Sequence, residues 1–172
     1  PYEKARLKAM EAALPARFES ALECGCAEGH FTERLARHAL RVTSVDISSI
    51  ALARAKARAP QARFMEGDLL GGEPGEDGPY NAVVLGDVLY YLDRPGVAAE
   101  FEALFFKIAS WLKPGGRIIL AHGFAGDKEL AHRRSFRERF EAAGLALVSE
   151  GPVAGTERDG VRCLLSVVKK IS

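Results

Sequence analysis

The sequence predicts an α/β fold in which a doubly wound parallel sheet ends in an antiparallel pair of strands. Short apolar runs alternate with amphipathic segments along most of the chain, a pattern typical of parallel strands joined by crossover helices. Near the C-terminus, the apolar runs 146–149 and 163–169 are separated by GPVAGTERDG. Because this connection is too short for a crossover helix, the last two strands are expected to pair antiparallel.

The first predicted helix covers residues 2–14, within an N-terminal segment of residues 1–15. Its apolar residues are spaced three and four apart and a proline stops it; they are Leu7, Met10 and Leu14. Two interpretations stay open. The helix packs against the core, or it forms a lid over a ligand site, with Tyr2 and Arg6 near the mouth.

The remaining elements follow in alternation. Strands are predicted over 18–24, 42–46, 62–65, 80–85 and 117–123, and helices over 31–39, 50–59, 95–112 and 131–143. Serine, proline and glycine residues supply the helix caps and stops. The segment 70–79 is rich in Gly, Pro and acids and is expected to be a surface loop. The arginines of the last helix are interpreted as a solvated face rather than a binding patch: Arg133, Arg134, Arg137 and Arg139.

Length and composition narrow the class of protein. A chain of 172 residues, 48% hydrophobic and 27% charged, favours a single globular domain over 1–172. The net charge of +1 and the lack of an 18-residue apolar run argue against nucleic acid and membrane partners, so the expected partner is a small molecule. The chain begins at Pro1 rather than Met, which is consistent with a missing upstream segment.

The cysteines indicate neither a disulfide framework nor a metal site. A C-x-C pair with no further His or Cys cluster is a poor zinc site, so no metal is expected. Small reduced side chains in a tight turn are the simpler interpretation, and the expected compartment is the reducing cytoplasm. The three cysteines are Cys24, Cys26 and Cys163.

The stretch FESALECGCAEGH, residues 18–30, carries the strongest functional signal. A short apolar run leads into a loop with small residues at alternate positions, and a helical pattern follows at once; the small residues are Gly25, Ala27 and Gly29. Small residues let the backbone approach a ligand, and the helix N-terminus offers free N–H groups. Asp46 lies 21 positions after Gly25, the distance at which such a unit places an acid on a ribose.

The loop discriminates between two nucleotide-type cofactors. The dinucleotide fingerprint G-x-G-x-x-G/A requires a middle glycine and a third small residue where the helix packs on the strand. Counted from Gly25, those positions hold Ala27 and His30. The fit to a nicotinamide dinucleotide is therefore poor, although a nicotinamide-dependent oxidoreductase stays as an alternative.

Acidic residues end four successive predicted strands. They are Glu23, Asp46, Asp68 and Asp87. Ligands of doubly wound sheets bind outside the carboxyl ends of the strands, at the point where the strand order reverses. Packing alone does not account for four acids at such positions, so the sequence predicts a ligand site at this edge.

The pattern E-x-G-x-A-x-G resembles the first motif of the class I S-adenosylmethionine (SAM) methyltransferases. VDIS, EGDL, the strand before Asp87 and LKPGGRIIL follow in the order and spacing of that family over nearly the whole chain. The similarity is closest to the NodS-like N-methyltransferases, which act on an amino sugar of a chitin-type oligosaccharide. LECGCAEGHFTERLARH, DVLYYLD and CLLSVV carry that part of the resemblance.

The resemblance implies a Rossmann-like class I methyltransferase fold that binds SAM and releases S-adenosylhomocysteine (SAH). The implied activity is methyl transfer to an amino or hydroxyl group of a small polar acceptor, such as a sugar or glycoside. A catalytically inactive SAM-binding protein of the same fold is the non-enzyme alternative.

The resemblance also implies roles for individual residues. The methionine portion of SAM would contact Glu23, Gly25, Cys26 and Ala27. The ribose hydroxyls would bind Asp46. The adenine would pack on Ile47, with its amino group on Asp68 and with Leu69 alongside. The sulfonium end would lie near Gly86 and Asp87.

The acceptor side is predicted from the strand ends. Asp87 follows the fourth strand, Tyr90 and Tyr91 come three and four positions later, and His122 ends the adjacent fifth strand. A carboxylate or imidazole can assist deprotonation of an amine, so Asp87 and His122 are candidate general bases, and Tyr90 is a candidate for the acceptor pocket. The structural alternatives are a turn cap for Asp87, core packing for the tyrosines and a satisfied loop residue for His122.

Overall fold

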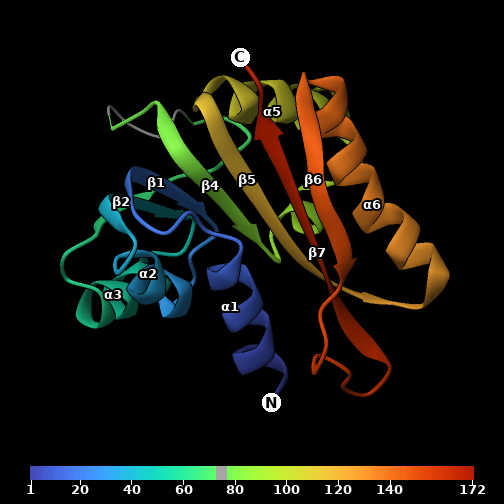
Figure 1. Ribbon diagram of the computed structural model, residues 1–172, viewed down its shortest axis with the longest axis horizontal. Coiled ribbons are helices and arrows are strands. Elements are labelled where there is room, and N and C mark those ends of the chain that lie inside the picture. The colour runs from blue at the N-terminus through green and yellow to red at the C-terminus, as the bar shows by residue number, and fades with distance from the viewer. Residues whose placement is uncertain (73–76) are drawn as a thin grey trace.

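A seven-stranded sheet runs through the computed structural model, which describes residues 1–72 and 77–172 (Figure 1). The strand order is β3-β2-β1-β4-β5-β7-β6, and β7 is antiparallel to both of its neighbours while the pairs from β3 to β5 are parallel. The strands are β1 (Phe18–Cys24), β2 (Ala39–Asp46), β3 (Arg63–Glu66), β4 (Tyr80–Gly86), β5 (Leu112–Ala125), β6 (Leu145–Pro152) and β7 (Val161–Lys170). The predicted doubly wound sheet with its antiparallel end is confirmed.

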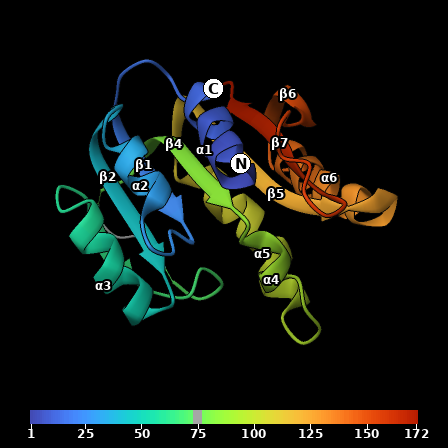
Figure 2. The ribbon, with the colours of Figure 1, turned by 90° about the horizontal axis from the view of Figure 1, so that it is seen from below.

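Helices cover both faces of the sheet (Figure 2). The helices are α1 (Tyr2–Ala12), α2 (His30–Leu35), α3 (Ser49–Arg58), α4 (Leu89–Leu92), α5 (Ala98–Ser110) and α6 (Gly126–Ala142). Val83 and Leu85 of β4 pack with α5 and α6, whereas Ala82 and Val84 pack with α1 and α2. A central parallel strand is buried on both faces, which explains its continuous apolar run.

Several element boundaries differ from the predicted ones. The first crossover helix ends at Leu35, and Ala39, predicted to end that helix, instead begins β2 opposite Phe18. Helix α6 starts at Gly126, before the predicted start at 131. No Ser or Thr marks that start; instead the Glu129 carboxylate accepts the Ala125 N–H at 2.7 Å, as the acidic residue of a capping box does.

Further differences concern the turns and the elements beside them. Short helix α4 was not predicted, and the long helix begins at Ala98 rather than at the predicted Pro95, because Gly96 adopts a φ of 91°. β5 starts at Leu112, inside LKPGG, and its pairing with β4 shifts register between Tyr80 and Ala82. The middle of the predicted loop 70–79 falls at residues 73–76, outside the described residues.

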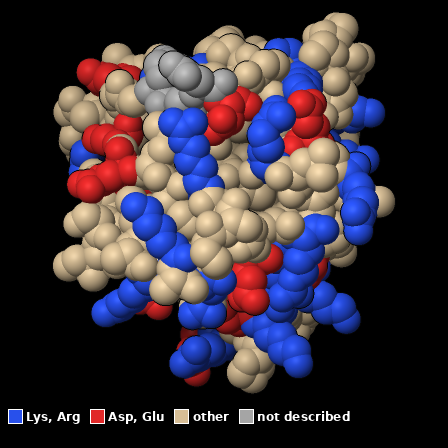
Figure 3. Space-filling model, turned by 90° about the vertical axis from the view of Figure 1, so that its left-hand side faces the viewer, with Lys and Arg blue, Asp and Glu red and all other residues tan. Residues whose placement is uncertain are grey.

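Charged side chains of both signs are interspersed on the face seen in Figure 3. Ion pairs between charged side chains of the described surface include Arg41 with Glu19, Arg54 with Glu28 and Arg63 with Asp77. Within the described residues, no helix combines the length and the apolar character needed to cross a membrane. The three cysteines are buried and free.

Candidate functional site

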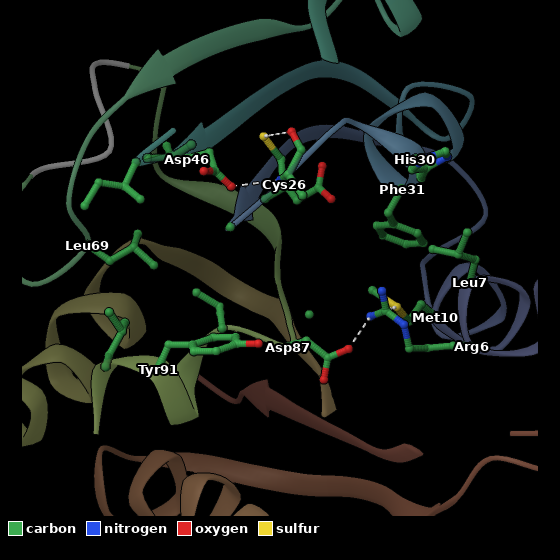
Figure 4. Close-up of a pocket in the computed structure, with 18 of the residues that line it drawn as sticks. Arg6, Leu7, Met10, Cys26, His30, Phe31, Asp46, Leu69, Asp87 and Tyr91 are labelled. Atoms are coloured by element: carbon green, nitrogen blue, oxygen red, sulfur yellow. Dashed lines mark hydrogen bonds and ion pairs between the residues drawn. The ribbon is translucent and has the colours of Figure 1, made fainter. Parts of the chain in front are cut away.

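A cavity of about 490 Å³ lies at the carboxyl ends of β1, β2 and β4, where the strand order reverses (Figure 4). This volume is in the range of small-ligand and cofactor sites. All the residues that the resemblance assigned to the cofactor line it: Glu23, Gly25, Cys26, Ala27, Asp46, Ile47, Asp68, Leu69, Gly86 and Asp87. The structure therefore brings together residues that are up to 64 positions apart in the sequence.

The loop between β1 and α2 explains the alternate small residues. Gly25, Ala27 and Gly29 have φ values of 76°, 46° and 79°, the left-handed region that favours glycine. A Cβ on Gly25 would lie 2.9 Å from Cγ2 of Val88, so a side chain there would collide with the wall of the cavity. The small residues thus allow the left-handed backbone conformation of the loop, and Gly25 leaves room at the wall of the cavity.

Asp46 anchors this loop from the end of β2. Its Oδ2 accepts the Ala27 N–H at 2.8 Å, and its Oδ1 accepts the Ser48 N–H at 2.9 Å. Each carboxylate oxygen has a further lone pair, so the side chain can accept hydrogen bonds from ligand hydroxyls while it holds the loop.

Glu23 lies at the floor of the cavity and is buried. Its Oε2 accepts hydrogen bonds from Thr32 Oγ1 at 2.5 Å and from Ser44 Oγ at 3.1 Å. Burial disfavours the charged form and raises the pKa of Glu23 to about 7. The carboxyl group can therefore gain or lose a proton near neutral pH.

The opposite side of the cavity is apolar. Ile47 is 70% exposed, and Leu69 is buried beside the cavity. The Oδ1 of Asp68 accepts the Leu70 N–H at 3.0 Å, a bond that caps a turn, and Asp68 also lines the cavity. An apolar surface formed by Ile47 and Leu69 next to a carboxylate suits a flat ring that carries an amino group.

Asp87 occupies the end of β4 at a φ of 49°. Its Oδ1 accepts the Gly123 N–H at 2.7 Å and the Tyr90 hydroxyl at 3.3 Å. Its Oδ2 lies 3.5 Å from a terminal nitrogen of Arg6 (Figure 4). Oδ1 is thus fixed by two hydrogen bonds from the protein, and Oδ2 faces the cavity beside Arg6.

Helix α1 forms one wall of this cavity through Glu3, Arg6, Leu7 and Met10. Arg6 is also bound to Glu3 at 2.6 Å, and a Cβ on Gly86 would lie 3.0 Å from its guanidinium. The helix therefore covers the site as well as packing on the core, which the sequence left open.

The predicted acceptor-side residues are not all at the cavity. Tyr91 lines it and is exposed, but neither Tyr90 nor His122 does. Tyr90 reaches the site indirectly, through its hydroxyl contact with Asp87. His122 is 2% exposed, and its Nε2 accepts the Leu89 N–H at 3.4 Å.

The surroundings of His122 do not suit a general base. Its ring contacts the rings of Phe136 and Tyr90, and burial lowers the pKa of His122 to about 3. An imidazole of such low basicity, turned away from the cavity, fits the alternative of a satisfied structural residue, although His122 lies in β5 rather than in a loop.

Some lining residues were not among the sequence candidates. His30 and Phe31 directly follow the glycine loop and could have been found from that position, as could Val45 before Asp46. Among the described lining residues, the acids are Glu3, Glu23, Asp46, Asp68 and Asp87, and Arg6 is the one Lys or Arg. The described lining of the cavity therefore carries more acidic than basic side chains, which favours a cationic ligand.

Comparisons with known proteins agree on one family. The family described as methyltransferase domain matches residues 21–116. Nodulation protein S of Rhizobium tropici is 32% identical over 101 residues, which are 58% of this chain and 41% of that protein. Trans-aconitate 2-methyltransferase of Delftia acidovorans is 31% identical over 121 residues, 68% of this chain and 42% of that protein. The chain spans less than half the length of these relatives.

A solved structure has the same fold. The N-methyltransferase NodS from Bradyrhizobium japonicum, in complex with SAH, superposes with a TM-score of 0.82 at 24% identity. The match covers 100% of this chain and 89% of that structure.

Proposed function

We propose, since this chain belongs to the methyltransferase domain family, that it binds SAM and transfers a methyl group to a small polar acceptor. One observation carries the proposal: the acids that end β1, β2 and β4 converge with the glycine loop on a single cavity. SAM carries a sulfonium, an ammonium and one carboxylate, which suits a cavity with several carboxylates and one guanidinium. The SAH bound in the NodS structure supports the same choice of cofactor.

The nucleoside half would occupy the side of the cavity nearest β2. Asp46 would accept hydrogen bonds from the ribose hydroxyls through the lone pairs that Ala27 and Ser48 leave free. Ile47 and Leu69 would pack on the adenine ring, and Asp68 would accept from its amino group.

The methionine half would lie along the loop of Gly25, Cys26 and Ala27, toward α1. We assign its carboxylate to Arg6, the one Lys or Arg among the described residues that line the cavity. A guanidinium binds a carboxylate through paired N–H groups. In this assignment, Arg6 exchanges part of its contact with Asp87 and Glu3 for the ligand.

The chemistry that SAM supplies when bound is a methyl group activated by a sulfonium. The residues of this chain have to orient the acceptor, because methyl transfer requires the acceptor atom to be close to the methyl carbon and in line with the bond that breaks. Asp87 Oδ2 can accept a hydrogen from the acceptor amine or hydroxyl and hold its lone pair toward the methyl carbon. Tyr91 lines the same end of the cavity and can contact the acceptor, whereas Tyr90 acts on Asp87 rather than on the acceptor.

An amino group is the favoured acceptor, and an amino sugar or glycoside is the proposed class. The Asp87 carboxylate lies at the acceptor end of the cavity, where it can accept a hydrogen bond from an amine and would repel a carboxylate. The similarity to nodulation protein S agrees with an amine. The three free buried cysteines fit the reducing cytoplasm as the proposed compartment.

Calorimetric titration with SAM, SAH, NAD and NADP tests the cofactor. We expect binding of SAM and SAH and none of the dinucleotides; the reverse would favour the nicotinamide-dependent alternative. Transfer of a labelled methyl group to glucosamine, compared with glucose and glucuronate, tests the activity. SAM binding without transfer to any member of a wider amine panel would favour the inactive alternative.

A further inference from the structure

We propose that Arg133 of α6 is a positioning residue for Asp87. The inference rests on the proposed function, in which Asp87 faces the sulfonium end of SAM. The sequence pattern placed Arg133 on a solvated face, but its side chain is 10% exposed. A guanidinium held away from water has its donors committed to the protein, and here those contacts lead to Asp87 by two routes.

The first route runs through the backbone of β5. Arg133 Nε donates to the Gly123 carbonyl oxygen at 2.8 Å, and the Gly123 N–H donates to Asp87 Oδ1 at 2.7 Å. Gly123 also pairs with Cys163 of the neighbouring strand β7. Arg133 therefore fixes the residue whose amide holds the Asp87 carboxylate.

The second route runs through Tyr90. The Arg133 guanidinium lies 4.2 Å from the centre of the Tyr90 ring, a cation–π contact. The Tyr90 hydroxyl donates to the same oxygen, Asp87 Oδ1, at 3.3 Å. Among the described residues, the two groups that donate to Oδ1 therefore both belong to residues that contact Arg133.

Other contacts hold Arg133 itself in place. A terminal nitrogen donates to His132 Nδ1 at 2.6 Å, and His132 Nε2 lies 2.6 Å from Asp93 beyond α4. This series of hydrogen bonds connects α6 to the segment that carries Tyr90. The connection matters for Asp87, because its left-handed backbone conformation persists only where the surrounding structure holds it. With Oδ1 held in this way, Oδ2 faces the cavity, where it lies 3.5 Å from the Arg6 guanidinium.

The test compares ligands that differ in charge at the position of the transferred methyl group. SAM and sinefungin are cationic there and SAH is neutral, so the ratio of SAH to SAM dissociation constants reports how well Asp87 faces that charge. Asp87→Asn should lower this ratio by about tenfold, since a carboxylate close to a cation is lost. Arg133→Gln should lower it by about threefold, and sinefungin should follow SAM.

The direction of the change separates positioning from simple electrostatics. Loss of the Arg133 charge alone would raise the affinity for a cationic ligand, whereas a displaced Asp87 lowers it. Arg133→Lys keeps the charge but cannot stack on Tyr90 and bind Gly123 together, so it should also lower the ratio. Arg139→Gln is the control, because Arg139 lies on the same helix but bonds Glu102 and Ser135.

An unchanged or raised ratio in the Arg133 variants, with a lowered ratio in Asp87→Asn, overturns this inference alone. If Arg133→Gln does not fold, Arg133→Lys decides in the same way. An unchanged ratio in Asp87→Asn overturns both the placement of Asp87 and this inference. A parent protein that binds neither SAM nor SAH overturns the proposed function itself.

Discussion

The Arg6 guanidinium lies 3.5 Å from the Asp87 carboxylate, and this contact joins the first helix to the end of β4. Arg6 is also bound to Glu3 one turn earlier in α1. Since both partners are carboxylates, a ligand carboxylate entering the cavity competes for the same guanidinium. The position of α1 and the binding of the methionine half are therefore linked.

Replacing Arg6 by Met should weaken SAH binding by about 10- to 100-fold, the scale of a lost hydrogen bond to a charged group. Methylthioadenosine, which has no methionine carboxylate, should bind the variant as tightly as the parent. Calorimetry with the two ligands measures the difference, and Lys8→Met, on the exposed side of the same helix, is the control. Equal losses for both ligands would rule out a carboxylate contact at Arg6.

Asp46→Ala should weaken SAM binding by about 3 kcal/mol, because two hydrogen bonds to a charged group are lost. The loop also loses the anchor of the Ala27 N–H, which adds to the effect. Calorimetry and thermal unfolding measure affinity and folding separately. The matched control is Glu66→Ala, since Glu66 is exposed and lies opposite Asp46 at the end of β3. A folded Asp46→Ala protein with parental affinity would contradict the ribose assignment.

Glu23 should make stability fall as the pH rises. The folded-state pKa of about 7 lies above the ordinary value of 4.5, so folding favours the protonated carboxyl group. Its contribution is complete below pH 4.5 and is lost as the pH rises through about 7, a change of about 3 kcal/mol. Urea unfolding of the parent and of Glu23→Gln across this range measures it. The idea fails if the difference in unfolding free energy between the two proteins does not vary with pH.

His122 should have the opposite effect on the pH dependence of stability: its contribution should fall as the pH falls. Burial lowers its pKa from 6.5 to about 3, so the unfolded chain binds a proton more readily than the folded protein. The stability that the neutral ring contributes is present above pH 6.5 and is lost as the pH falls toward 3. His122→Leu should therefore lose less stability than the parent on acidification. At pH 7.5 its SAM affinity should stay close to that of the parent; a large loss would mean that His122 supports the site, directly or through its contact with Tyr90.

The sequence was sufficient for the fold class and for the residues of the β1–α2 loop and the end of β2 that line the cavity. Residues 18–46 contain the strand, the loop and the acid in one continuous unit, so local spacing predicts the place of Gly25 and Asp46 at the cavity. The resemblance to class I SAM methyltransferases, and to NodS among them, is confirmed by the family match and by the fold of NodS.

The acceptor side depends on contacts between distant segments, which local patterns do not encode. The order of the strands correctly placed His122 near the carboxyl end of β5. However, its side chain points to the same face of the sheet as those of Ile118 and Leu120, which pack in the core beneath α5 and α6. The contact between Arg6 and Asp87 spans 81 positions, and the contacts of Arg133 require the pairing of α6 with β5. The spacing of residues along the sequence predicts neither of these contacts.

A crystal structure of the protein with SAH tests the central claim most directly. The account predicts electron density in the cavity around Gly25, with the ribose hydroxyls on Asp46, the adenine against Ile47 and the methionine carboxylate on Arg6. Density for SAH at another place, or an empty cavity at saturating SAH, would contradict it.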